Sequence, residues 1–60
     1  MTFTVKIKCD NAAFDPPEVE VAHLLREAAN RIENGDCHGG LVDSNGNHVG
    51  EYKFSGRRVE

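Results

Sequence analysis

The stretch from Asp15 to Gly35 constrains the fold most, because it is the only segment long and periodic enough to predict an amphipathic α-helix by itself. Its apolar residues recur with the 3.6-residue period of one helix face. These residues are Val21, Leu25, Ala28 and Ile32, with Leu24 beside them. The polar residues between them, which include Glu20, Glu27 and Arg31, are expected to face water. The sequence therefore predicts one long helix with Leu25 buried.

Both ends of this helix carry capping signals. Asp15 is placed to act as the N-cap, with Pro16 at the first helical position and Glu18 completing a pattern like a capping box. At the other end, Asn34-Gly35 offers the left-handed backbone conformation in which many helices terminate. We expect the helix to begin directly after Asp15 and to stop at Gly35.

Residues 2–9 alternate strictly between apolar and polar side chains, which is the pattern of a half-buried strand. The apolar positions are Phe3, Val5, Ile7 and Cys9, and the polar positions are Thr2, Thr4, Lys6 and Lys8. One face of this strand is therefore expected to meet the helix.

Asn45-Gly46 is the strongest hairpin signal in the chain, because a two-residue type I′ turn needs positive φ at both positions. If these two residues form the loop, Val42 faces Val49 and Leu41 faces Gly50. Leu41, Tyr52 and Phe54 then share the face under the helix. The opposite, exposed face would carry Val42, Val49, Glu51 and Lys53.

The predicted fold class is α+β, a single small β-α-β-β domain over residues 1–54, with one helix on one face of a three-stranded sheet. A right-handed crossover makes the first two strands parallel, so the third strand fits between them. The tail, residues 55–60, carries no pattern and is expected to be frayed.

Length and charge limit the function. A chain of 60 residues buries only about 60% of its unfolded surface, so association with another molecule would help to stabilise it. A net charge of −3 without a basic stripe argues against nucleic acid as a partner. The sequence has no apolar run of transmembrane length and no signal-peptide pattern, so we expect no membrane association and a cytoplasmic location, where thiols stay reduced.

The histidines and cysteines do not have the spacing of a metal site, which uses short pairs such as C-x2-C or H-x3-H. They are His23, His38, His48, Cys9 and Cys37. Cys37-His38 beside Asp36 is also a poor catalytic arrangement, because adjacent residues rarely bring a thiol and an imidazole into contact, and one small sheet offers no deep cleft. We expect no metal, no cofactor and no enzymatic activity.

Several pieces of the chain resemble a group of very small uncharacterised proteins encoded in phages and prophages of proteobacteria. The pieces span about four fifths of the chain; they are residues 4–7, 10–14, 20–26 and 43–50. The resemblance covers the whole pattern and includes no catalytic motif, so it implies context only. Short phage accessory proteins commonly bind and block a host protein, including components of CRISPR or other defence systems.

The first functional hypothesis is therefore a non-catalytic phage protein that binds and inhibits a host protein and forms a homodimer. The dimer would use the outward sheet face, because an exposed valine pair and free sheet edges favour association; the residues are Val42, Val49, Glu51 and Lys53. The host target would meet a mildly acidic patch on the helix and the following loop. This patch comprises Glu20, Glu27, Arg31, Asp36 and His38.

The alternative hypothesis is a small-ligand binder that sequesters a nucleotide signal. A dimer groove lined by Lys6, Lys8, Arg57 and Arg58 would hold phosphates. Stabilisation by nucleotides separates this hypothesis from the first.

Overall fold

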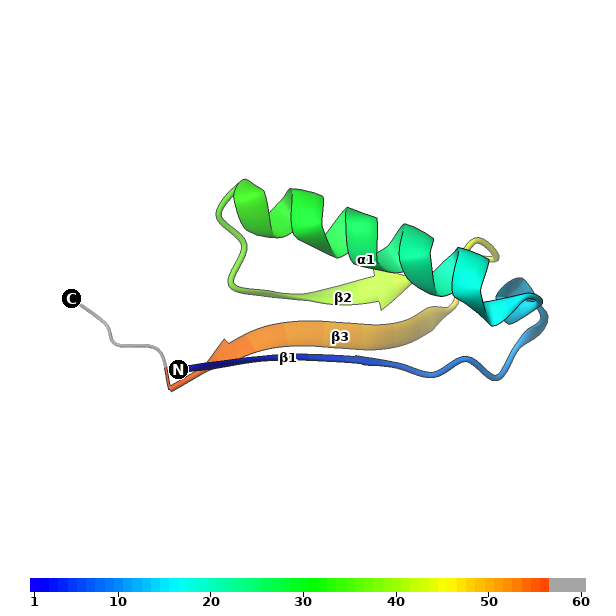
Figure 1. Ribbon diagram of the computed structural model, residues 1–60, viewed down its shortest axis with the longest axis horizontal. Helices are drawn as coiled ribbons and strands as arrows, with labels where there is room; N and C mark the ends of the chain where they lie inside the picture. The colour runs from blue at the N-terminus through cyan, green and yellow to red at the C-terminus, as the bar shows by residue number, and fades with distance from the viewer. Residues whose placement is uncertain (57–60) are drawn as a thin grey trace.

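The computed structural model describes residues 1–56 and contains one helix packed on a three-stranded antiparallel sheet. The elements are β1 (Thr2–Ile7), a 3₁₀ helix η1 (Ala12–Phe14), α1 (Pro17–Glu33), β2 (His38–Val42) and β3 (His48–Ser55). The strand order is β1-β3-β2, and α1 lies along one face of the sheet (Figure 1). The predicted α+β class, element order and central third strand are confirmed.

The helix starts one residue later than predicted, at Pro17, and Asp15 is not its N-cap. Asp15 instead ends η1, and Pro16 is the N-cap residue of α1, with no side-chain cap. The physical reason is the second proline, because a residue that precedes proline is pushed towards extended backbone. Pro16 accordingly has a ψ of 147°. At the other end, Gly35 has a φ of +105°, so the predicted left-handed terminus is confirmed.

The buried face of α1 is centred on Leu24 and not on Leu25. Leu24 is fully buried, whereas Leu25 is 44% exposed. Ala28 is buried as predicted, and Val21 and Ile32 are partly buried against the core. The prediction of a buried Leu25 was wrong, because Leu24 and Leu25 point about 100° apart on a helix and only the sheet selects between them.

The hairpin has a three-residue loop and a β-bulge in place of the predicted two-residue turn. Asp43 pairs with Asn47 through the Asn47 carbonyl, which accepts the Asp43 N–H at 2.9 Å, and only Gly46 in this loop has positive φ. The longer loop pairs Val42 with His48, while Leu41 still faces Gly50 as predicted. Val49 is the extra residue of the bulge.

The core lies between α1 and the two strands β2 and β3. Its buried side chains are Phe14, Leu24, Ala28, Leu41, Val49 and Tyr52. The placement of Leu41 and Tyr52 under the helix is confirmed. Val49 also joins this core with 9% exposure, so its predicted position on the outward face was wrong, and the bulge is the cause.

The ends of the sheet differ slightly from the predicted boundaries. β1 ends at Ile7 and not at Cys9, although the Lys8 N–H still donates to the Val49 carbonyl at 2.8 Å. Ser55 pairs with Thr2, so β3 runs one residue past the predicted domain end. The rest of the expected frayed tail, residues 57–60, lies outside the described residues.

Candidate functional site

The polar flank of α1 is fixed to the hairpin through Glu20. This side chain is 6% exposed, and its two carboxylate oxygens accept hydrogen bonds from the Ser44 N–H at 2.8 Å and the Ser44 hydroxyl at 2.7 Å. Glu20 therefore orders the hairpin loop against the helix. Its predicted place on an exposed acidic patch was wrong, because the backbone N–H of Ser44 needs an acceptor at this point.

Glu27 and Arg31 hold the other end of the same flank against β2. Arg31 Nη1 donates to the Gly40 carbonyl at 2.6 Å, and Arg31 Nη2 lies 2.8 Å from Glu27 Oε1. The Tyr52 hydroxyl raises the pKa of Arg31; burial opposes this rise and Glu27 adds to it. These two residues are half-buried and tie the helix to the edge of the sheet.

Asp43 is a buried hydrogen-bond acceptor that shapes the hairpin loop. It accepts the backbone N–H groups of Asn45 and Asn47, both at 2.9 Å, and the side-chain amide of Asn11 at 2.7 Å. Burial alone raises the pKa of Asp43, but these hydrogen bonds outweigh it, so the pKa lies below its ordinary value. The same carboxylate thus explains why the loop has three residues.

The remaining predicted patch residues lie at the far end of the molecule from Glu20. Asp36 Oδ2 is 3.5 Å from the Tyr52 hydroxyl, and His38 is exposed at the start of β2. The structure therefore does not gather the five predicted partner-binding residues into one surface. Glu20 fastens the helix to the hairpin loop, and Arg31 with Glu27 fastens it to β2. Asp36 and His38 lie at the start of β2.

The predicted dimer residues are divided in a similar way. Val49 is in the core, and Val42 is 42% exposed at the end of β2. Glu51 and Lys53 are exposed on β3, where they pair with Lys6 and Thr4 of β1. The outward sheet face carries these charged and polar side chains, and the valine pair expected there does not exist.

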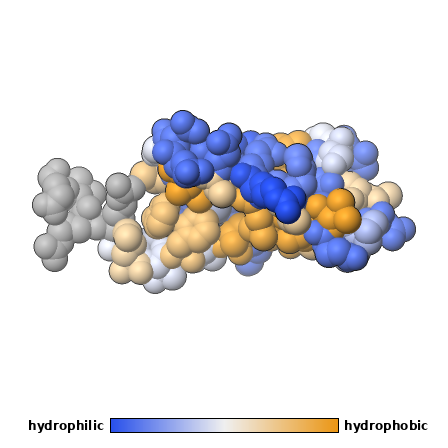
Figure 2. Space-filling model, turned by 45° about the horizontal axis from the view of Figure 1, so that its top comes forward, coloured by the Kyte–Doolittle hydropathy of each residue, from blue (hydrophilic) through white to orange (hydrophobic). Residues whose placement is uncertain are grey.

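Neighbouring apolar side chains are exposed on the helix side of β1. Phe3 is 42% exposed and Val5 is 37% exposed, although both alternate onto the face that the helix covers elsewhere. Met1 and Leu25 are 79% and 44% exposed. We call these four residues, Met1, Phe3, Val5 and Leu25, the apolar strip. Figure 2 shows hydrophobic surface running along the sheet below the hydrophilic outer side of the helix.

The strip is open because α1 sits towards β2. The contacts of Glu20 with Ser44 and of Arg31 with Gly40 hold one flank of the helix over β2 and the hairpin. The opposite flank of the helix, which carries Leu25, therefore faces the β1 side. Phe3 contacts the sheet through Phe54, with ring centroids 4.9 Å apart, but nothing among residues 1–56 covers its outer side fully.

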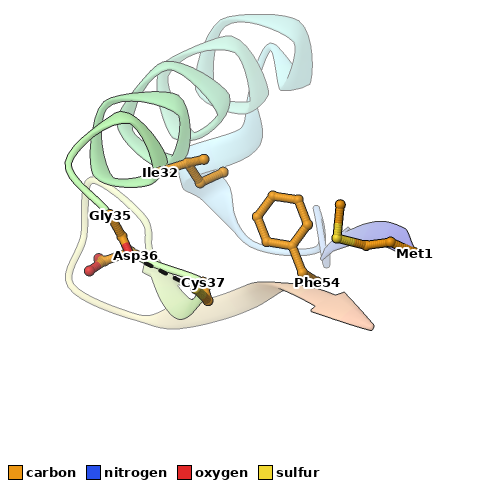
Figure 3. A pocket seen from close by; sticks show the side chains of 6 residues that line it. All are labelled: Met1, Ile32, Gly35, Asp36, Cys37 and Phe54. Atoms are coloured by element: carbon orange, nitrogen blue, oxygen red, sulfur yellow. Dashed lines mark hydrogen bonds between the residues drawn. The ribbon is translucent and has the colours of Figure 1, made fainter. Parts of the chain in front are cut away.

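A shallow pocket of about 280 Å³ lies at the Met1 end of the strip. Figure 3 shows Ile32 of α1, Phe54 of β3 and Met1 around this pocket, while the carboxylate of Asp36 points away from it. The apolar strip thus continues into a hollow between the end of the helix and the sheet.

Lys6 and Lys8, named for the nucleotide hypothesis, line a different open hollow of about 230 Å³ together with His48 and Glu51. Arg57 and Arg58 lie outside the described residues.

Within residues 1–56, no three His, Cys, Asp or Glu side chains cluster as a metal site. The helix in this part of the chain is not long and apolar enough to cross a membrane.

Sequence reasoning identified the apolar alternation of β1 but missed that this strand is the uncovered part of the sheet. The sequence feature that could have shown this is Leu24 beside Leu25, since two adjacent leucines cannot both be at the centre of one buried stripe.

Comparison with models of protein families, with curated proteins and with solved structures gave no match for this chain.

Proposed function

We propose that the protein is a non-catalytic interaction protein that binds another protein through the apolar strip. The supporting observation is the exposure of Phe3, Val5 and Leu25 on one side of so small a domain. The strip has no titratable or nucleophilic side chain, so its chemistry favours binding over reaction. Covering the exposed half of each of these side chains contributes roughly 1 kcal/mol.

The resemblance to small proteins of phages and prophages supports a more specific proposal. The partner is then a host protein, including a component of a CRISPR or other defence system, and binding inhibits it in the cytoplasm of the host cell. The acidic patch loses its support as the binding surface, because Glu20, Glu27 and Arg31 serve to hold the helix in place. The apolar strip takes the place of the acidic patch as the proposed binding surface.

The test compares two variants that add the same charge to the same helix. Leu25→Glu places a carboxylate in the strip, and Val19→Glu, at a position that is 63% exposed outside the strip, is the matched control. A partner captured from host lysate is purified and titrated against the parent and both variants. We expect at least about tenfold weaker binding for Leu25→Glu alone, because a charge is costly to bury.

Equal affinity of all three chains would contradict the proposed surface. Salt gives a second criterion, since apolar binding should change little as ionic strength rises, whereas binding by an acidic patch weakens. A strong loss of affinity in high salt, together with normal binding of Leu25→Glu, would restore the charged surface as the better proposal.

The nucleotide-binding alternative keeps one supporting observation, the placement of Lys6, Lys8 and His48 around one hollow. Phosphates favour such a group of basic side chains, although Glu51 in the same hollow opposes them. Thermal shift against cyclic and linear nucleotides tests this alternative. A rise in melting temperature that Lys6→Gln abolishes would support it, and no rise at millimolar ligand would exclude it.

A further inference from the structure

We propose that the open edge of β1 pairs with β1 of a second copy, in antiparallel orientation about a two-fold axis at Val5. The two sheets would then form one six-stranded sheet. This inference goes beyond the proposed function, because it concerns the backbone edge of β1 and not the side chains of the strip. It also replaces the dimer surface predicted from the sequence, because Val49 is buried in the core and does not lie on the outward sheet face.

The backbone groups of β1 point alternately to β3 and to the open edge. The Lys8 N–H donates to the Val49 carbonyl, in register with the pairing of Lys6 with Glu51 and of Thr4 with Lys53. In an antiparallel ladder, hydrogen-bonded and non-hydrogen-bonded pairs alternate. The even-numbered residues therefore bond to β3. The odd-numbered residues Phe3, Val5 and Ile7 direct their N–H and C=O groups to the open edge.

The other edge of the sheet, which is the edge of β2, is blocked. Phe54 donates its N–H to the Cys37 carbonyl, so by the same alternation Gly40 directs its carbonyl away from β3. Arg31 binds this carbonyl at 2.6 Å, and Glu27 fixes the guanidinium. The edge of β2 thus carries a side chain where another strand would have to bond. Proteins commonly protect sheet edges in this way, and β1 has no such protection within residues 1–56.

The register of the two β1 strands follows from these outward backbone groups. With Val5 opposite Val5 of the second copy, Phe3 lies opposite Ile7, and all outward N–H and C=O groups of these residues find partners. A shift by one residue in either direction would pair outward groups with groups already bonded to β3. The register also keeps Phe3, Val5 and Ile7 of both copies on one face of the sheet.

Charge on the other face agrees with this register. Lys6 of one copy lies opposite Thr4 of the second copy, so no two lysines face each other directly. Like charges directly opposite would destabilise the pair. The Lys6 side chain meanwhile keeps Glu51 as its neighbour within its own copy.

The test removes the central N–H without touching the ladder inside one copy. Val5→Pro loses only an N–H that points to the open edge, and proline is tolerated on edge strands. Val5→Thr keeps the N–H and the branched shape and is the matched control. Sedimentation velocity from micromolar to millimolar concentration should show a monomer–dimer equilibrium for the parent and for Val5→Thr. Val5→Pro should dissociate at least about tenfold more readily, because two central hydrogen bonds are lost.

Amide hydrogen exchange of the parent chain gives a second measurement that does not depend on any variant. Exchange at Phe3, Val5 and Ile7 should slow as concentration rises, and it should slow more than exchange at Thr4 and Lys6, which already pair with β3 inside each copy. This measurement decides the question if Val5→Pro fails to fold.

A charge variant tests the register itself. Thr4→Glu places a carboxylate opposite Lys6 of the second copy twice per dimer, and should tighten the dimer roughly twofold to tenfold at low salt. Adding Lys6→Gln should remove this gain. A parent chain that stays monomeric at millimolar concentration would overturn the proposal. A dimer that Val5→Pro leaves intact, or protection that appears at Gly40 and not at Val5, would overturn it as well.

Discussion

Truncation of Leu24 should test the packing of this domain more sharply than any other single change. Leu24 is fully buried in the core, and Leu25, its neighbour on the same helix, is 44% exposed. Leu24→Ala removes buried atoms and leaves a cavity between α1 and the sheet, which costs about 2–5 kcal/mol at comparable sites. Leu25→Ala leaves no cavity and removes atoms that are already half in water, so its cost should be about 1 kcal/mol.

The size of the domain makes this difference easy to measure. A chain of 60 residues is expected to have a free energy of unfolding of roughly 3–9 kcal/mol. Leu24→Ala should therefore remove about half of the stability, and Leu25→Ala only a small part. Urea titration followed by far-ultraviolet circular dichroism, at low micromolar concentration to keep dimers out, measures both values. Equal losses, or a larger loss for Leu25→Ala, would refute the helix orientation described above.

Two further predictions concern the carboxylates that order the hairpin. The hydrogen bonds to Asp43 hold its pKa below the unfolded value of about 3.9. The ionised carboxylate therefore stabilises the fold fully above that pH, and this stabilisation is lost as pH falls through the folded pKa. On acidification the urea midpoint of the parent should fall, and the difference in midpoint between the parent and Asp43→Asn should shrink. Glu20→Gln should cost about 1 kcal/mol, because it weakens two charge-assisted hydrogen bonds from Ser44, whereas Glu18→Gln on the exposed first turn should be nearly neutral in the same titration.

The fold was predictable from the sequence because several local signals agree on it. The alternation in β1, the long helical period and the hairpin signal at Asn45-Gly46 each define one element, and chain order with a right-handed crossover leaves one simple strand order. Where the prediction failed, the missing information was tertiary. The choice between Leu24 and Leu25 depends on how the helix is rotated about its axis on the sheet. The apolar period alone does not decide which of two adjacent leucines faces the core.

The candidate site was much less predictable, for a related reason. Glu20 reads as a solvent-exposed helix residue until the Ser44 N–H is placed beside it. Val49 reads as an outward strand residue until Asp43 draws the loop into three residues and the bulge turns Val49 into the core. The first error arises from a hydrogen bond between residues that are distant in sequence, and the second arises from a change of strand register. Both errors placed the predicted binding surfaces on residues away from β1.

The proposed dimer and the apolar strip are geometrically compatible, because one uses the backbone edge of β1 and the other uses its side chains. In a six-stranded sheet, the boundary of β2 and β3 in one copy lies four strand spacings, or about 19 Å, from the same boundary in the second copy. Each helix over that boundary is about 10 Å wide, so roughly one helix width remains between them. Phe3, Val5 and Ile7 of both copies would form the floor of this groove, and Leu25 would lie along each wall. A partner helix lying there would contact both copies at once. Partner binding should then favour the dimer by mass action, with one partner for every two chains.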